Sequence, residues 1–296
     1  MNPALLYFAS GDSLYAGAGL LFLVVAASQW VTPKWTLLRN FLAWVALTMI
    51  VMACPPFAWT LDAMFLLAFA LWFFLANQSS TGRTIARLRQ AATGFLVGML
   101  VALPAIEFPH RTMPRITGAL SDHLVIIGDS ISSGINPGEP TWPSVFQKLT
   151  GIAVKNLSRP GAQVADGRAM AEKVTPDDRL ILIELGGNDL LGGVPSGAFE
   201  QGLEATVARL AAQGRTLVML ELPLLPQKVA YGQIQRRLAA RYGIWLIPKR
   251  CFTGVLGAAN ATSDGLHLSS AGAYRMAQLI EQIISPVLVP RAGGNT

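Results

Sequence analysis

The strongest constraint on the fold of this chain is the uneven distribution of charge along it. Residues 1–109 hold only five Lys or Arg and three Asp or Glu, out of 23 and 17 in the 296-residue chain. Four stretches in this part are almost wholly apolar: Leu14–Val31, Phe41–Cys54, Ala63–Ala76 and Gly94–Ile106. Since a helix needs roughly 20 mostly apolar residues to cross a bilayer, they predict a membrane region over residues 1–110 with about four transmembrane helices. The middle two stretches are short, and the alternative is that they are buried helices of a soluble fold.

The basic residues of this region predict its orientation. The connections after the first and third stretches carry all five of them, and the connection after the second carries none (Lys34, Arg39, Arg83, Arg87 and Arg89). Basic short loops stay cytoplasmic, so both termini are expected to face outward, although Arg111 and Arg115 are a weaker signal in the opposite sense. The leader lacks Lys and Arg, which favours a retained helix over a cleaved signal peptide. We therefore expect a bacterial cytoplasmic-membrane protein whose second part faces the periplasm or the exterior.

Residues 116–296 have the composition and pattern of an α/β domain. Short β-rich apolar runs alternate with helical stretches, which predicts a parallel sheet of five strands covered on both faces. The predicted strands are Leu124–Ile127, Ala153–Leu157, Leu180–Glu184, Leu217–Leu220 and Ile244–Ile247. The predicted helices are Trp142–Leu149, Ala162–Lys173, Gly197–Ala212, Tyr231–Tyr242 and Ser270–Ile284. In such sheets the site lies beyond the carboxyl ends of the strands.

The residues that follow these strands indicate acyl chemistry. Gly128-Asp129-Ser130 follows the first strand, and a serine hydroxyl there needs a base to become a nucleophile. His267 is the expected base, and Asp264, three residues earlier, can fix its tautomer and stabilise the imidazolium. The Ser130 N–H, the Gly161 N–H and the Asn188 amide are candidate donors to the oxyanion.

These blocks resemble those of the SGNH/GDSL hydrolase family, in the family's order: Gly128-Asp129-Ser130, Gly161, Gly186-x-Asn188-Asp189 and Asp264-x-x-His267. The resemblance covers residues 120–287 and none of the membrane region. It implies a flavodoxin-like, three-layer α/β/α hydrolase domain with Ser130 as nucleophile, His267 as base and Asp264 as its partner. It also implies an oxyanion hole of Ser130, Gly161 and Asn188. Around Asn188 the chain is similar to the arylesterase, thioesterase and lysophospholipase branch, and Ile131 replaces the usual leucine.

Several other residues are expected to have structural roles only. Gly11-Asp12-Ser13-Leu14 repeats the motif, but no strand precedes it and an apolar stretch follows, so we interpret it as a helix start. Asp189 is expected to hold its loop. Cys54 and Cys251 are expected not to pair, and without a Cys/His cluster we expect neither a metal nor another cofactor.

Three hypotheses about function follow. The first is a membrane-anchored serine esterase that hydrolyses acyl esters of envelope lipids or glycans. The second is an O-acyltransferase that passes the acyl group to a polysaccharide through the same triad, and the third is a non-enzymatic membrane scaffold. Nucleic-acid binding is not expected, because no Lys/Arg run is interleaved with aromatic residues. Protein partners and oligomeric state stay open.

Overall fold

The fold was taken from a computed structural model that describes residues 2–30, 32–79, 82–118, 120–136, 138–211 and 214–289. Two predicted element ends, Val31 and Ala212, lie outside the described residues. The chain divides into two compact units. One contains Tyr7–Arg111 together with Leu225–Val229, and the other contains the remainder. Each unit is described by itself.

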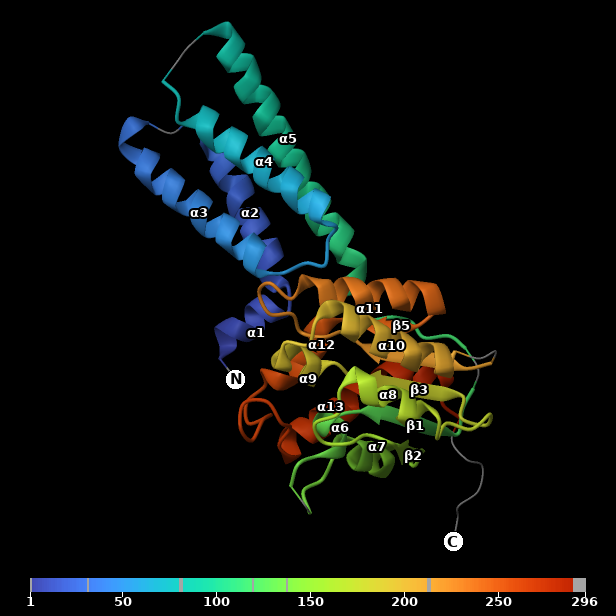
Figure 1. Cartoon of the computed structure of the whole chain (residues 1–296). Helices are drawn as coiled ribbons and strands as arrows, with labels where there is room; N and C mark the ends of the chain where they lie inside the picture. Colours follow the sequence, from blue (N-terminus) through green and yellow to red (C-terminus); the bar gives the residue numbers. More distant parts are fainter. Residues whose placement is uncertain are drawn as a thin grey trace. The chain divides into compact units, whose positions relative to one another are not determined.

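The first unit is helical, as the apolar stretches predict. Four longer helices pack side by side around a shared core of leucine, alanine and aromatic side chains (Figure 1). They are α2 (Asp12–Ala27), α3 (Thr36–Met52), α4 (Trp59–Ala76) and α5 (Arg83–Glu107); α1 (Pro3–Ala9) precedes them, and short 3₁₀ turns occupy Pro33–Trp35 and Phe108–Arg111. Helix α3 ends shortly before Pro55-Pro56, where the chain lacks the N–H groups that would continue it.

The structure does not confirm the predicted number of membrane-spanning helices. By length and composition, α4 and the continuous helical segment Arg83–Arg111 qualify. The pair α1 and α2 qualifies only as one span bent by 82°, and α3, with 17 residues, is shorter than a full span. The described helices thus supply two candidate spans, or three with the bent pair, and the total of four stays a prediction.

The second unit is built on a parallel sheet of five strands in the order β2-β1-β3-β4-β5. The strands are β1 (His123–Gly128), β2 (Ala153–Asn156), β3 (Leu180–Glu184), β4 (Thr216–Leu220) and β5 (Trp245–Ile247), each within two residues of its predicted bounds. Every residue of β3 and β4 is buried, as in a sheet covered on both faces. The predicted α/β fold is therefore confirmed.

Helices cover both faces of the sheet (Figure 1). On one face α7 (Trp142–Thr150), α12 (Lys249–Leu256) and α13 (Ser270–Ile284) share a core with the strands. On the other, α8 (Val164–Ala171) packs against α10 (Ser196–Leu210), which contacts α11 (Val229–Tyr242) through the rings of Phe199 and Tyr231. Three helices were not predicted: α12, α6 (Ser130–Ser133) and α9 (Gly187–Gly192). All three have eight residues or fewer, too few to show a clear helical periodicity.

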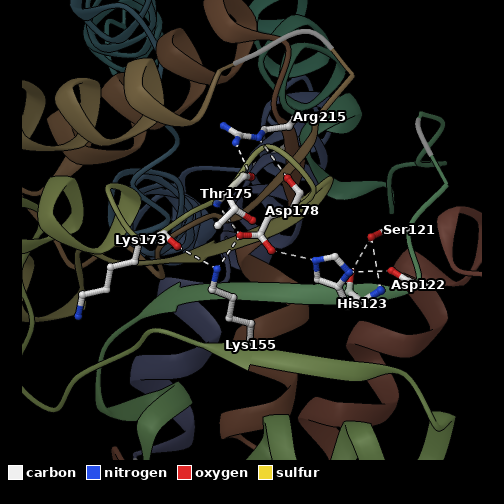
Figure 2. A network of polar contacts seen from close by, with 8 residues as sticks. All are labelled: Ser121, Asp122, His123, Lys155, Lys173, Thr175, Asp178 and Arg215. Atoms are coloured by element: carbon white, nitrogen blue, oxygen red, sulfur yellow. Dashed lines mark hydrogen bonds and ion pairs between the residues drawn. The ribbon is translucent and has the colours of Figure 1, made fainter.

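A polar network stabilises the edge of the sheet where the strands begin (Figure 2). His123 contacts Asp122 Oδ1 through Nδ1 (2.7 Å) and Asp178 Oδ1 through Nε2 (2.9 Å). Lys155 Nζ donates to Asp178 Oδ2 at 2.7 Å, and Arg215 Nε donates to the carbonyl of Asp178. Although burial alone would raise it, the hydrogen bonds from Lys155, the Thr175 N–H and His123 lower the pKa of Asp178 to about 2. His123 thus has a structural role at the opposite end of β1 from Ser130.

Candidate active site

The turn that carries Ser130 follows directly from the end of β1. The Asp129 side chain caps the first turn of α6, because its Oδ1 accepts the N–H of Ile131 at 2.9 Å. A Cβ at Gly128 would lie 2.7 Å from Oε2 of Glu184, so only glycine fits there. This close packing holds Ser130 at the carboxyl edge of the sheet, where the sequence predicts the site.

His267 lies next to Ser130 although 137 residues separate them. His267 Nε2 is 3.1 Å from Ser130 Oγ, and His267 Nδ1 is 2.6 Å from Asp264 Oδ2. With Nδ1 protonated, the ring donates to Asp264 and its Nε2 accepts the hydroxyl proton of Ser130, which is the geometry of a serine–histidine–aspartate triad.

The loop before α13 sets the orientation of the histidine ring. Asp264 Oδ1 accepts the N–H groups of Leu266 (2.9 Å) and His267 (2.8 Å). These backbone hydrogen bonds fix the position of the carboxylate that contacts the His267 ring. Hydrogen bonds from the backbone and the ring of His267 and from Leu266 hold the pKa of Asp264 far below its usual range. The carboxylate therefore stays ionised, and it favours the protonated imidazole that proton transfer produces.

The peptide N–H groups of Ser130 and Gly161 are candidate donors to a substrate oxygen. Within the described part of the chain, neither the Ser130 N–H nor the Gly161 N–H donates to a protein acceptor. Gly161 has a φ of 73°, a conformation that glycine adopts without strain. Asn188 belongs to α9, beyond β3, and its Nδ2 donates to Asp129 Oδ2 (3.1 Å) and to the carbonyl of Ala162 (3.0 Å). Both of its amide hydrogens are thus engaged, and it can bind an oxyanion only by releasing or sharing one.

A small cavity opens beside Ser130 and His267. Its wall comes from α6, the following loop and the start of α13, and apolar side chains predominate in it (Ile131, Ile135, Pro140, Trp142, Leu268 and Ala273). The cavity thus places apolar side chains beside Ser130 and His267.

The remaining candidates have structural contacts away from the serine. Asp189 is buried, and its Oδ2 accepts the N–H of Val164 at 3.0 Å, so it ties the loop to the start of α8. Ser13 of the second Gly-Asp-Ser sequence is buried within α2. No disulfide joins Cys54 and Cys251. No cluster of three His, Cys, Asp or Glu side chains suited to a metal occurs among the described residues.

One residue at this site was not predicted from the sequence. Glu184, the last residue of β3, pairs with Gly128 in the parallel register and lies beneath the turn that carries Ser130. The available signal was a carboxylic acid that ends an otherwise apolar, central strand. Acids of that kind are almost never buried without a partner.

Comparisons with known proteins find similar sequences and a similar fold. Residues 126–275 match the model of the "GDSL-like Lipase/Acylhydrolase family". The chain is 27% identical over 185 residues to "Esterase TesA" of Pseudomonas aeruginosa, which covers 57% of this chain and 91% of the esterase. It is 28% identical over 180 residues to "Arylesterase" of Vibrio mimicus (55% and 88%). The crystal structure of the psychrotrophic esterase EstA from Pseudoalteromonas sp. has the same fold, with a TM-score of 0.50, 20% identity, and coverage of 56% of this chain and 98% of EstA.

Proposed function

Because the chain belongs to the GDSL-like lipase/acylhydrolase family and is a carboxylic ester hydrolase, we propose that Ser130, His267 and Asp264 are its catalytic triad. The observation that carries the proposal is the unbroken hydrogen-bonded chain from Ser130 Oγ through the imidazole to the Asp264 carboxylate. A scaffold without activity has no need of such a chain.

The first half of the reaction forms an acyl-enzyme. Ser130 Oγ bonds to the ester carbonyl carbon while its proton passes to His267 Nε2. The carbon–oxygen bond of the alcohol then breaks, and the same proton passes from Nε2 to the departing oxygen. Asp264 stabilises the imidazolium between these two transfers.

The second half returns the enzyme to its starting state. Water enters, gives a proton to His267 Nε2 and bonds to the acyl carbon. Nε2 then protonates Ser130 Oγ as the serine–acyl bond breaks and the free acid leaves.

The oxyanion of each tetrahedral intermediate binds to the N–H groups of Ser130 and Gly161. Asn188 adds a third donor when one of its amide hydrogens leaves Asp129 or Ala162. Preorganised donors of this kind are each worth about 3–4 kcal/mol in the transition state.

Covalent capture of the serine tests this mechanism. We expect the purified full-length chain in detergent to be labelled by a fluorophosphonate on the peptide that contains Ser130, and to release free acid from p-nitrophenyl esters. Label on another residue, or no label, would contradict the mechanism.

The chain length of the preferred ester indicates the substrate class. An acetyl optimum would favour acylated glycans as substrates and a long-chain optimum would favour lipids. Acyl groups that appear on an added glycan, in place of free acid, would identify an O-acyltransferase.

The helical unit is proposed to anchor the enzyme in the bacterial cytoplasmic membrane. Its outer surface is apolar: Leu37, Phe41, Leu67 and Phe74 are more than 60% exposed, which suits contact with lipid. Trp30 and Trp59, near helix ends, are also highly exposed, as residues at the headgroup level are. The apolar face supports the anchor independently of the number of spans.

Arg39 and Arg89, one from each basic connection, lie at the same end of this unit, whereas Arg111 pairs with Asp12 at the start of α2. Arg39 Nη1 donates to the carbonyl of Ala76 (3.2 Å), and Arg89 Nε donates to the carbonyl of Leu75 (3.1 Å). The two basic connections therefore meet at the carboxyl end of α4, where cations also favour the helix dipole. These two connections support a cytoplasmic position for that end and an outer position for the hydrolase unit; Arg111 is the weaker, opposite signal because it precedes a long domain.

Cysteine labelling tests the orientation. In a chain whose own cysteines are replaced, we expect Ser196→Cys, on the exposed start of α10, to react with a membrane-impermeant maleimide in spheroplasts. The matched variant Gln78→Cys, at the basic end, should react only after lysis. The reverse pattern would place the hydrolase unit in the cytosol and exclude envelope esters as substrates.

A further inference from the structure

Two carboxyl groups are buried together beneath the turn that carries Ser130. Asp129 is 3% exposed and Glu184 is 6% exposed. The register of β1 and β3 pairs Gly128 with Glu184, which brings the Glu184 carboxyl directly under the backbone that leads to Asp129. In the described part of the chain, neither acid forms an ion pair with Lys or Arg. Among the described residues, no Lys or Arg therefore offsets the charge of either group.

Glu184 binds the turn on both sides of the serine. Its Oε2 accepts the N–H of Asp129 at 3.2 Å and the hydroxyl of Ser132 at 2.8 Å. Ser132 Oγ in turn accepts the indole N–H of Trp142 at 3.0 Å. Ser130 thus lies between two residues that share one buried acceptor.

Asp129 extends this contact to the oxyanion side of the site. One of its oxygens accepts the Ile131 N–H, and the other accepts Asn188 Nδ2 at 3.1 Å. The side chains of Asp129 and Glu184 also lie within hydrogen-bonding reach of each other. Two carboxyl oxygens can share a hydrogen bond only when one group carries a proton.

The proton belongs on Glu184. Two adjacent buried carboxylates without a counter-cation do not both ionise. Burial raises the pKa of Asp129 as well, but the amide N–H of Ile131 and the amide group of Asn188 both point at this carboxylate and stabilise its anion. Burial, together with the charge of Asp129, raises the pKa of Glu184 well above its usual value.

We propose that Glu184 is a positioning residue, a neutral acid that donates its proton to the Asp129 carboxylate and so holds both the Ser130 turn and the Asn188 amide. The inference rests on the proposed function of Ser130 and Asn188. Glu184 does not touch the substrate; it acts through Asp129 and Ser132. Its charge state matters because an ionised Glu184 would repel Asp129 and lose the hydrogen bond that joins them.

Two substitutions test whether Glu184 acts as a neutral acid or as a carboxylate. Glu184→Gln keeps an acceptor for Asp129 N–H and Ser132 and a donor for the Asp129 carboxylate, so we expect it to keep at least about a third of kcat. Glu184→Ala removes all three contacts, and we expect kcat to fall about 10- to 100-fold with KM within about threefold, as misplaced catalytic groups cause. A glutamine variant as impaired as the alanine variant would overturn the proposal.

Infrared difference spectra of the full-length chain in detergent detect the protonated carboxyl group of Glu184 directly. Subtracting the Glu184→Gln spectrum from the wild-type spectrum at neutral pH should leave the C=O band of a protonated carboxyl. Glu221 provides the matched control, since it is equally buried but paired with Arg236 at 2.7 Å, and Glu221→Gln should not remove that band. A missing band would overturn the proposal even if Glu184→Ala fails to fold.

Fluorophosphonate labelling shows whether a negative result contradicts the charge state proposed for Glu184 or the proposed catalytic triad. If wild-type Ser130 is labelled but the band is absent, the charge state assigned to Glu184 is wrong and the triad stands. If the band is present but Ser130 is not labelled, the catalytic role of Ser130 is wrong, and the neutral acid remains only as a structural feature.

Discussion

Ser130→Ala should lower kcat for ester hydrolysis by a factor on the order of 10⁵ to 10⁶, the cost measured when a triad nucleophile is removed. The alanine side chain has no atom that can bond to the carbonyl carbon, so the acyl-enzyme cannot form. The oxyanion donors are unaffected by the change and leave a residual rate above that of water. Initial rates on p-nitrophenyl acetate and on longer esters, with purified full-length chains in detergent, measure the effect.

The chain contains a control for this substitution. Ser13 follows a second Gly-Asp pair, is buried in α2, and its hydroxyl has no hydrogen-bond partner in the structure. Ser13→Ala removes the same hydroxyl from a second copy of the Gly-Asp-Ser tripeptide. This variant should retain the wild-type rate and the fluorophosphonate label. A Ser130→Ala chain that hydrolyses esters at more than about 1% of the wild-type rate would rule out the proposed nucleophile.

His267→Ala should lower kcat by a similar factor, because the nucleophile and its base act as a unit. Its Nε2 is the ring atom within proton-transfer distance of Ser130 Oγ, at 3.1 Å. Without the imidazole, the hydroxyl keeps its proton and the leaving alcohol receives none. The rate of fluorophosphonate labelling should fall together with kcat, since both depend on the same proton transfer.

His123→Gln is the matched control for the histidine. Both ring nitrogens of His123 contact carboxylates at the start of β1, while Ser130 follows the end of that strand. This variant should keep its kcat, with any loss confined to thermal stability. If His123→Gln abolished turnover while His267→Ala did not, the assignment of the base would be wrong.

Much of the hydrolase fold could be predicted because its signals are local. The strand Leu180–Glu184 and the helix Ser270–Ile284 were predicted with their observed bounds, since apolar runs and periodic patterns reflect neighbouring residues. Helix α12 was missed because eight residues hold barely two turns. The number of membrane spans was not confirmed, because α3 is short and α2 qualifies only as part of a bent pair.

The amino-acid sequence by itself determined which chemical groups follow each strand: a hydroxyl after the first, an amide after the third, and an acid and an imidazole before the last helix. Only the tertiary structure decided which of them meet. The 3.1 Å contact between Ser130 and His267 spans 137 residues, and the Asp129–Glu184 pair exists because β1 lies beside β3 in the sheet. Local sequence carries no information on strand order, and burial of an acid depends on what packs around it. For that reason the proton on Glu184 could be inferred only from the folded chain.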